Sequence, residues 1–377
     1  MRKILIAIIL LTVFKTEAQP SVLSVADSLY AYGNYTKAIQ IYKTHNNPSE
    51  VYDKIAKAYL AIGNDGEALL NYDLSLKANP DNALIKYDYA KLLSRHQKLE
   101  EASVLLKELL NIDTKNPNYH YELGLVFELQ SDTLAINSFK NAFDLDSTHQ
   151  KAIYKIAEDY LVNRKHNLSL KYIDTGLRAY ENNIELINLK ALNYYWDEKY
   201  VESAKWFEKE IELGQSSQFI HEKLSFCYAQ DSEYKKAIEQ GEIALQYDPK
   251  NKTNLYIQGQ LYERIGDFKN AEKYISEALE LMDIPLDAEY SKLAVIYNSQ
   301  NKYKEAIDAI QIAINENPKN QFTQFLLVLT KDKYYADIDS KIKVYEDFKE
   351  KFPNNIYVSF VDKRLKELKE EKFMKGE

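Results

Sequence analysis

Six histidines and a single cysteine are the side chains of this 377-residue chain best suited to bind a metal or act as a nucleophile. The histidines are His45, His96, His120, His149, His166 and His221, and no two of them have the spacing of metal ligands on one helix. Cys227, within "SFCYAQ", has no cationic neighbour in sequence that would stabilise a thiolate, so we expect a half-buried, small apolar side chain. The chain has no P-loop and no G-x-G-x-x-G, G-x-S-x-G or H-E-x-x-H motif. The sequence therefore predicts no catalytic residue, no metal site and no cofactor, and a protein that is not an enzyme.

The composition indicates a folded, acidic and largely helical protein. Hydrophobic residues make up 45% of the chain, enough to bury a sizeable core. Only 10 Gly and 8 Pro are present, which favours long helices over loops. The net charge of −8 argues against nucleic acid and against an anionic membrane surface as partners, and it favours protein partners that carry basic patches.

The N-terminal stretch "MRKILIAIILLTVFKTEAQP" has the pattern of a secretory signal peptide. Arg2 and Lys3 precede an apolar run of 11 residues, which is too short to cross a bilayer as a helix, and we expect cleavage after Ala18. The alternative is an ordinary buried helix or strand. Removing residues 1–18 would take away three basic residues and one acidic residue, which changes the net charge from −8 to −10. Export without cysteines for a disulfide predicts a bacterial envelope protein, periplasmic or secreted, with no membrane span in the mature chain.

A small residue recurs along the chain at nearly constant spacing. These anchor residues are Ala38, Ala68, Ala102, Ala135, Ser169, Ser203, Ala237, Ala271, Ala306 and Ser340. After a first gap of 30 residues, the spacings are 34, 33, 34, 34, 34, 34, 35 and 34. A fixed period of this length predicts a solenoid built from one repeated segment.

A second small residue precedes each anchor residue by eleven or twelve positions, and a large residue follows it three positions later. The small residues are Ala26, Ala56, Ala90, Gly124, Ala157, Ala191, Ser225, Gly259 and Ala294, with Val328 as the exception. The large residues are Leu29, Tyr59, Leu93, Phe127, Tyr160, Tyr194, Tyr228, Tyr262 and Tyr297. Apolar residues at i, i+3, i+4 and i+7 predict two amphipathic helices per repeated segment, whose small residues let the two backbones approach closely.

Glycine and proline mark where the helices end. Gly33, Gly63 and Gly266 stand between the two predicted helices, where a left-handed backbone conformation can end the first one. Pro80, Pro249 and Pro318 stand twelve residues after their anchor residues and are expected to end the second helix.

This pattern, from the small-x-x-large pair through Gly, aromatic and Ala to Pro, resembles the tetratricopeptide repeat (TPR) family. "LYERIGDFKNAEKYISEALEL", residues 261–281, is among the clearest copies, and the resemblance covers about residues 22–353. It implies an all-α fold, a right-handed α-solenoid of about ten helix-turn-helix repeats. The expected domains are the signal peptide at 1–18, the solenoid at 19–353 and a C-terminal capping helix at 354–377. On that helix we expect one apolar stripe made of Phe360, Val361, Leu365 and Leu368. Two local departures are Glu210, in place of a small residue, and Gly241, in place of a large one.

The resemblance also implies a concave groove, lined by the first helices, that holds an extended peptide or a helix. The groove positions carried over to this chain are Tyr87, Lys91, Arg95, Tyr121, Leu125, Tyr154, Glu158, Asn188, Leu192, Tyr195, Trp196, Phe219, Glu222, Phe226, Tyr256, Gln260 and Arg264. Tyr87, Tyr121 and Tyr154 share one slot in successive repeats and would make a ladder of rings. The alternative is that these rings pack between adjacent first helices.

The sequence thus predicts a non-enzymatic protein–protein interaction scaffold in the bacterial cell envelope, which binds a protein or peptide in the concave groove. The alternative is an envelope polymer- or glycan-binding module that uses the same rings as stacking platforms. The family's charged clamp for a partner's C-terminal carboxylate is not expected, because the second and third repeats carry Asp53, Lys57, Tyr87 and Lys91 at its positions.

Overall fold

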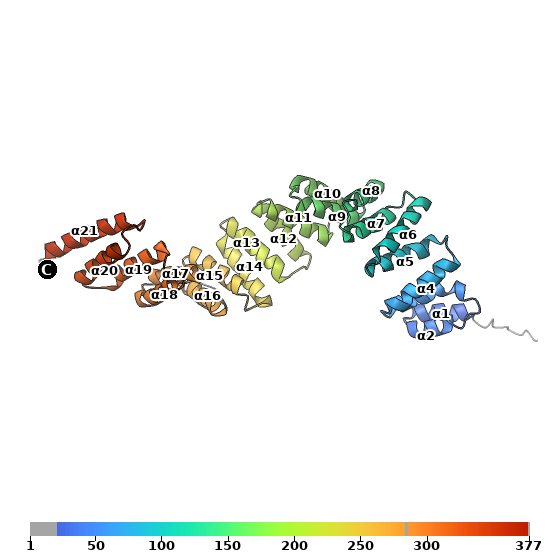
Figure 1. The fold of residues 1–377 in the computed structure, drawn as a ribbon, viewed down its shortest axis with the longest axis horizontal. Helices are drawn as coiled ribbons and strands as arrows, with labels where there is room; N and C mark the ends of the chain where they lie inside the picture. Colours follow the sequence, from blue (N-terminus) through green and yellow to red (C-terminus); the bar gives the residue numbers. More distant parts are fainter. Residues whose placement is uncertain (1–20, 283–285, 376–377) are drawn as a thin grey trace, which may run out of the picture. The chain divides into compact units, whose positions relative to one another are not determined.

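The computed structural model describes residues 21–282 and 286–375, and all regular structure in these residues is helical (Figure 1). The predicted signal peptide at residues 1–18 lies outside the described residues. The helices up to Val162 are α1 (Val22–Ala31), α2 (Tyr35–Tyr42), η1 (Pro48–Glu50), α3 (Tyr52–Ala61), α4 (Asp65–Ala78), α5 (Ala83–Arg95), α6 (Leu99–Ile112), α7 (Pro117–Leu129), α8 (Ala135–Leu145) and α9 (Gln150–Val162). Those that follow are α10 (His166–Ala179), α11 (Ile184–Trp196), α12 (Tyr200–Glu212), α13 (Gln218–Gln230), α14 (Tyr234–Tyr247), α15 (Lys252–Arg264), α16 (Phe268–Leu281), α17 (Asp287–Ser299), α18 (Tyr303–Glu316), α19 (Gln321–Tyr334), α20 (Ile338–Lys351) and α21 (Val358–Lys375). Not one of these described helices has both the length and the apolarity needed to cross a membrane.

Successive helices pair as the periodicity predicts, with an odd-numbered first helix and an even-numbered second helix in the repeats from α1/α2 to α7/α8 and from α11/α12 to α19/α20. The small residues lie at the contact between the two helices. The Ser225 hydroxyl donates to the Ala237 carbonyl at 2.7 Å, and the Ser203 hydroxyl donates to the Ala191 carbonyl at 2.9 Å. A Cβ on Gly259 would lie 2.5 Å from Ile275 Cγ1, so the close approach of α15 and α16 depends on that glycine.

Burial of the small residues confirms the predicted helix contact. All the small residues of the first helices are buried, as is Val328. Eight of the ten anchor residues are fully buried, and the exceptions are Ala135 and Ser340, which are only partly buried. Ala135 is the first residue of α8 and Ser340 is the third of α20, so neither lies as deep in its helix as the other anchor residues do.

One hydrogen-bonded turn joins the two helices in nine repeats. The carbonyl of the large residue, from Leu29 to Tyr297, accepts a bond from the backbone N–H five residues later at 2.8–3.0 Å. Gly33, Gly63 and Gly266 adopt φ of +75° to +78° there, which confirms their predicted role. In the other six turns the left-handed residue is Gln97, Ser131, Arg164, Glu198, Ser232 or Asn301. The turn is therefore imposed by helix packing as well as by glycine.

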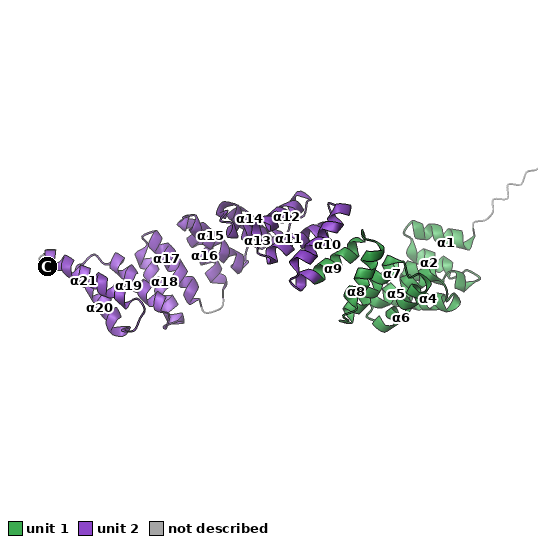
Figure 2. Cartoon of the chain, turned by 90° about the horizontal axis from the view of Figure 1, so that it is seen from above, with its two compact units in different colours: residues 1–159 green, residues 160–377 purple. Residues whose placement is uncertain are grey.

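The chain divides into two compact units, residues 1–159 and residues 160–377, with the division inside α9 (Figure 2). In the N-terminal unit the core lies between paired helices and is built around side chains such as Tyr72, Leu93 and Leu106. In the C-terminal unit a series of clusters follows the repeats, around Phe207, Ile275 and Ile310 among others.

Helix α21 covers the last repeat with part of the expected stripe. Val361 and Leu368 are fully buried, and Leu365 is partly buried in the same cluster. Phe360 is 49% exposed and meets Phe325 edge-on, at 5.3 Å between ring centroids, so it lies at the margin of this contact. Tyr357, just before the helix, takes the inner place and stacks on Phe325 at 4.3 Å.

Candidate functional site

Within each unit, first helices of neighbouring repeats contact one another, as α5 and α7 or α11 and α13 do, and their outer side chains form what we call the first-helix face. On this face of the N-terminal unit, the predicted groove residues bind mostly to their own chain. The Tyr87 hydroxyl lies 3.3 Å from the Glu122 carboxylate, and the Tyr87 ring lies 5.5 Å from that of Tyr119. The Lys91 ammonium is 3.8 Å from Glu122 and 5.1 Å from the centre of the Tyr87 ring. Burial raises the pKa of the Glu122 carboxyl, against the opposing effects of Lys91 and Tyr87.

The other two tyrosines of the predicted ladder are also half-buried. Tyr121 packs against Phe139 and His149, with ring centroids 5.8 Å and 5.1 Å apart, and the Tyr154 hydroxyl bonds to Glu158 at 3.1 Å. These contacts favour packing over a free binding ladder. Arg95 is exposed and lines a hollow of about 430 Å³ with Lys57 and Asp88.

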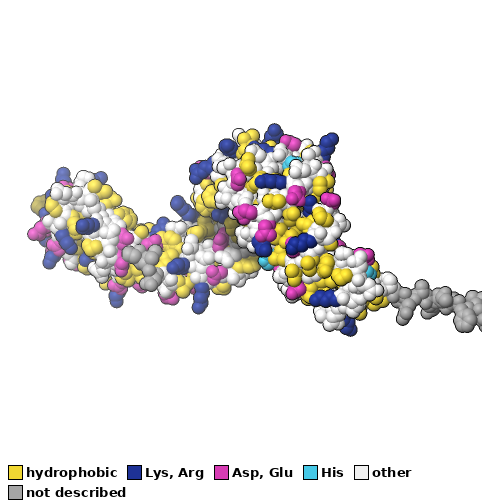
Figure 3. All heavy atoms as spheres, turned by 45° about the vertical axis from the view of Figure 1, so that its right-hand side comes forward, with side chains coloured by type: hydrophobic (Ala, Val, Ile, Leu, Met, Phe, Trp, Pro, Cys, Tyr) yellow, Lys and Arg dark blue, Asp and Glu magenta, His cyan; other side chains and the backbone are white. Residues whose placement is uncertain are grey.

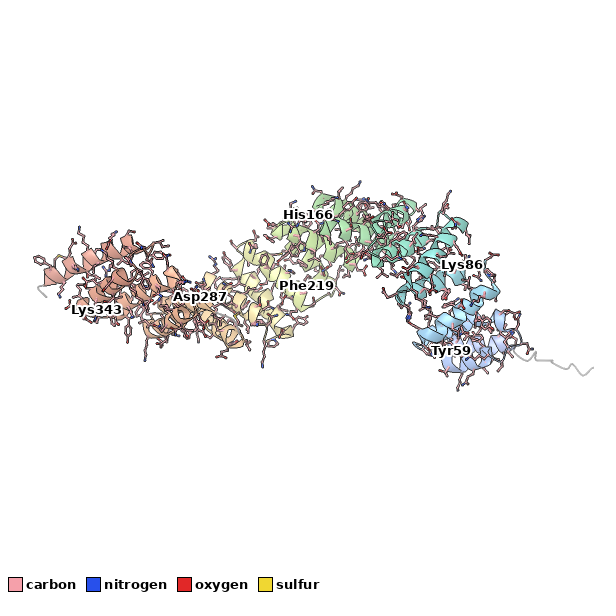
Figure 4. All side chains as sticks on the ribbon, in the orientation of Figure 1. Tyr59, Lys86, His166, Phe219, Asp287 and Lys343 are labelled. Carbon is pink, nitrogen blue, oxygen red and sulfur yellow. The ribbon has the colours of Figure 1, made fainter. Side chains whose placement is uncertain are left out.

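On the first-helix face of the C-terminal unit, α11 and α13 bring four rings together. Tyr195, Trp196, Phe219 and Phe226 form this aromatic patch. Trp196 is 61% exposed, Phe219 43% and Phe226 37%, whereas Tyr195 is half-buried beneath them. Tyr195 meets Trp196 edge-on at 5.2 Å and Phe226 at 5.4 Å, so the half-buried ring holds the exposed ones in place. Phe219 on α13 is labelled in Figure 4.

Lys223 is a member of this site that the sequence did not single out. Its ammonium lies 4.4 Å from the centre of the Tyr195 ring and 5.6 Å from those of Trp196 and Phe219. These are cation–π distances. Within the described residues no carboxylate lies within 4.0 Å of it. The sequence signal that could have identified Lys223 is its position four residues after Phe219, because residues at i and i+4 lie on the same face of a helix.

A hollow of about 230 Å³ adjoins the patch between α13 and α15 and is lined by Phe226, Glu222, Asn254 and Ile257, among others. The Glu222 carboxylate accepts bonds from Gln218 at 2.7 Å and from Asn254 at 2.5 Å.

Gly241 forms part of this lining, and the packing around it explains why this position carries no side chain. A Cβ there would clash with Oε1 of Gln258, a side chain only 1% exposed that donates to the Ile238 carbonyl. Gln258 thus fills the space that a large residue takes in other repeats.

Two further predicted groove residues serve the interior instead. The Asn188 amide donates to both oxygens of Glu210 at 3.0 and 3.2 Å, and Glu210 is 2% exposed. Burial raises the pKa of Glu210 to about 7, and the bond from Asn188 only partly opposes this. Tyr256 is half-buried among core residues that include Leu255 and Ala278, and burial raises its pKa.

The side chains suited to other chemistry are held in the interior or dispersed. Cys227 is fully buried, deeper than expected, and burial raises the pKa of its thiol. His221 is buried between Ser216 and Gln240, at 2.8 and 2.7 Å. In the part of the chain that the structure describes, no group of three His, Cys, Asp or Glu side chains could hold a metal ion.

Comparison with known proteins places the repeats in a family. Residues 63–123 and residues 253–281 each match a family model described as tetratricopeptide repeat. The chain is 23% identical over 209 residues to the human protein O-mannosyl-transferase TMTC3, a match that covers 54% of this chain and 22% of that protein. It is 22% identical over 214 residues to the TPR repeat-containing protein MJ1428 of Methanocaldococcus jannaschii, covering 54% and 38%. The chain therefore spans about two fifths or less of the length of these curated relatives.

Among solved structures, the chain is similar to YrrB, described as a TPR protein with an unusual peptide-binding site. That match has a TM-score of 0.46 and 15% identity, and covers 50% of this chain and 97% of YrrB. The helix pairs, their buried small contact residues and the two matched segments identify this chain as a tetratricopeptide-repeat protein.

Proposed function

We propose that this protein is a non-enzymatic scaffold that binds a protein or peptide partner on the first-helix face of α11 and α13. The observation that carries the proposal is the exposure of Trp196, Phe219 and Phe226 around Tyr195 and Lys223, which contact them. Rigid aromatic side chains bury a large area at little cost in rotamer entropy, and they dominate binding energy where proteins meet. The hollow beside Phe226 offers a place for a side chain of the partner.

We further propose that the protein works in the bacterial cell envelope, either periplasmic or secreted. The support is the sequence of residues 1–18, with its charged start, short apolar run and small residue at position 18. The net charge of −8 supports partners that carry basic regions, because opposite net charges favour encounter.

The proposal predicts that the double variant Trp196→Ala/Phe226→Ala loses the native partner. Loss of two central anchors typically weakens a complex by about 2 kcal/mol or more each. The measurement is crosslinking in the native envelope followed by identification of copurifying proteins, with circular dichroism to show unchanged helicity.

The matched control is Tyr32→Ala/Phe322→Ala, which removes two exposed rings outside the patch. A partner retained by the patch variant, or lost equally from both variants, would remove the proposed site.

The glycan alternative rests on the exposed face of Trp196, which could stack on a sugar ring. Trp206 is the second tryptophan and is half-buried beneath the Lys190 ammonium, 4.0 Å from the ring centre. In a Trp206→Phe background, fluorescence reports Trp196 alone. A saturable change in this fluorescence on addition of soluble envelope glycans would favour the glycan alternative. Unchanged fluorescence would favour a protein or peptide partner.

A further inference from the structure

Lys223 shares its position in the repeat with three other lysines. Lys54, Lys155, Lys223 and Lys292 each stand two residues before the small contact residue of their first helix. The other three each bind a carboxylate on the preceding first helix. The pairs are Lys54–Asp27 at 2.7 Å, Lys155–Glu128 at 3.0 Å and Lys292–Glu263 at 2.5 Å. A lysine in this slot is therefore normally neutralised by its own chain.

Lys223 differs because the preceding first helix presents rings. Glu128 and Glu263 stand four residues after the contact residues Gly124 and Gly259. The corresponding residue of α11, four after Ala191, is Tyr195. The Lys223 ammonium consequently lies over that ring and has no carboxylate within 4.0 Å among residues 21–282 and 286–375.

Glu222, which precedes Lys223 in sequence and lines the same hollow, is already engaged. Glu222 accepts bonds from Gln218 and Asn254, on the side of the hollow between α13 and α15. Ring faces attract the ammonium but leave its N–H donors without a carboxylate acceptor among the residues that the structure describes. A carboxylate arriving beside these rings would form a charge-assisted bond in a partly desolvated setting, where such bonds are strongest.

We infer that the partner presents an acidic side chain to Lys223, flanked by a large apolar side chain that packs on Trp196 and Phe226. This rests on the proposed function and specifies the partner's contact segment: a peptide with Asp or Glu beside an aromatic or large aliphatic residue. The overall negative charge concerns basic regions elsewhere on the partner and has little effect on this local contact, because charges more than about 8 Å away are largely screened at physiological salt. Both signs of charge are also intermixed on the face shown in Figure 3.

The test is selection of a displayed library of random linear dodecapeptides on the purified mature chain. Enriched peptides are expected to share Asp or Glu next to Phe, Trp, Leu or Ile. Their affinity is then measured for Lys223→Gln, which is expected to weaken binding by about tenfold or more. Lys292→Gln is the matched control, since it removes a lysine from the same slot in another repeat, and is expected to change affinity less than about twofold.

Tyr195→Glu provides a second, independent variant. It places a carboxylate at the position that Glu128 and Glu263 occupy in their repeats, so that Lys223 gains an ion pair within the chain. The variant should therefore lose its preference for acidic peptides although Lys223 itself is unchanged. Circular dichroism of each variant shows whether the fold is kept.

The outcomes separate this inference from the proposed function. Enriched peptides that lack acidic residues, or that bind Lys223→Gln as tightly as the wild type, would overturn the inference. If those peptides still lost binding to Trp196→Ala/Phe226→Ala, the proposed face would stand. A library that yields no peptide above background would count against both.

Discussion

In the N-terminal unit, Tyr87, Lys91 and Glu122 on α5 and α7 bind one another, and Tyr87 is further covered by Tyr119. In the C-terminal unit, α11 and α13 offer similar residue types, but Lys223 meets rings where the corresponding Lys155 and Lys292 meet carboxylates. Trp196 there is left 61% exposed. The same kinds of side chain on the same face of a repeat therefore stabilise the fold in one unit and stay available in the other. Whether such a side chain stabilises the fold or stays available depends on the residue that the neighbouring first helix places opposite it.

The largest expected difference between the two faces is in the free energy of unfolding. Tyr87→Ala should cost about 2–3 kcal/mol, because it removes a half-buried ring and leaves the Glu122 carboxyl with one partner fewer. Trp196→Ala should cost less than about 1 kcal/mol, because most of its ring already faces solvent. Urea unfolding of both variants checks this, and equal costs would break the comparison.

A second contrast concerns the surroundings of two carboxyl groups, those of Glu122 and Glu210. Glu122 has Lys91 beside it, whereas the polar partner of the Glu210 carboxylate in the described part of the chain is the Asn188 amide, and the pKa of Glu210 is raised to about 7. The folded protein therefore keeps the Glu210 proton while the unfolded chain releases it near its ordinary value of 4.5. The contribution of this group to stability is thus present below about pH 4.5 and is lost as the pH rises to about 7.

Glu210→Gln should accordingly raise the free energy of unfolding by about 1–3 kcal/mol at pH 8 and by little at pH 4. Urea titrations at both pH values measure it. Glu202→Gln, an exposed carboxyl on the same helix, is the control and should stay within about 0.5 kcal/mol of the wild type at both. A gain at pH 8 no larger than that of the control would show that Glu210 is ionised without cost.

The third contrast separates paired from unpaired lysines by stability. Lys292→Gln leaves Glu263 without its cation and should cost about 0.5–1 kcal/mol. Lys223→Gln breaks no ion pair and should cost less than about 0.5 kcal/mol. If Lys223→Gln proved the more destabilising change, its role would be in folding.

The smallest effect is expected at the turns. Gln97 has φ of +60° and Gly266 of +78° at the same place in their repeats. Gln97→Gly should therefore stabilise the protein by about 0.5 kcal/mol, while Gly266→Ala should destabilise it by a similar or larger amount, since a Cβ disfavours this conformation. Thermal unfolding of the two variants measures both signs, and a loss of stability in Gln97→Gly would mean that its side chain offsets the strain.

Much of the fold could be predicted because the periodic small residues leave one packing solution. Ala271 and Gly259 can only face each other's helix if the backbones approach closely, and the structure buries both. The turns were predictable at Gly33, Gly63 and Gly266, but not at Arg164 or Glu198, because a side chain with no turn preference carries no signal for a left-handed conformation.

The candidate site was predicted only in part. Position in the repeat assigned Trp196, Asn188 and Tyr256 alike to the groove, yet the structure exposes the first, bonds the second to Glu210 and packs the third among core residues. The sequence does not distinguish Lys223 from the three lysines at the same repeat position, all of which pair with a carboxylate. The sequence by itself determined the helix pairs, their contacts and their period, because these depend on spacing within one segment. Only the tertiary structure decided which side chains are free to bind, because that depends on what residues of another repeat place opposite them.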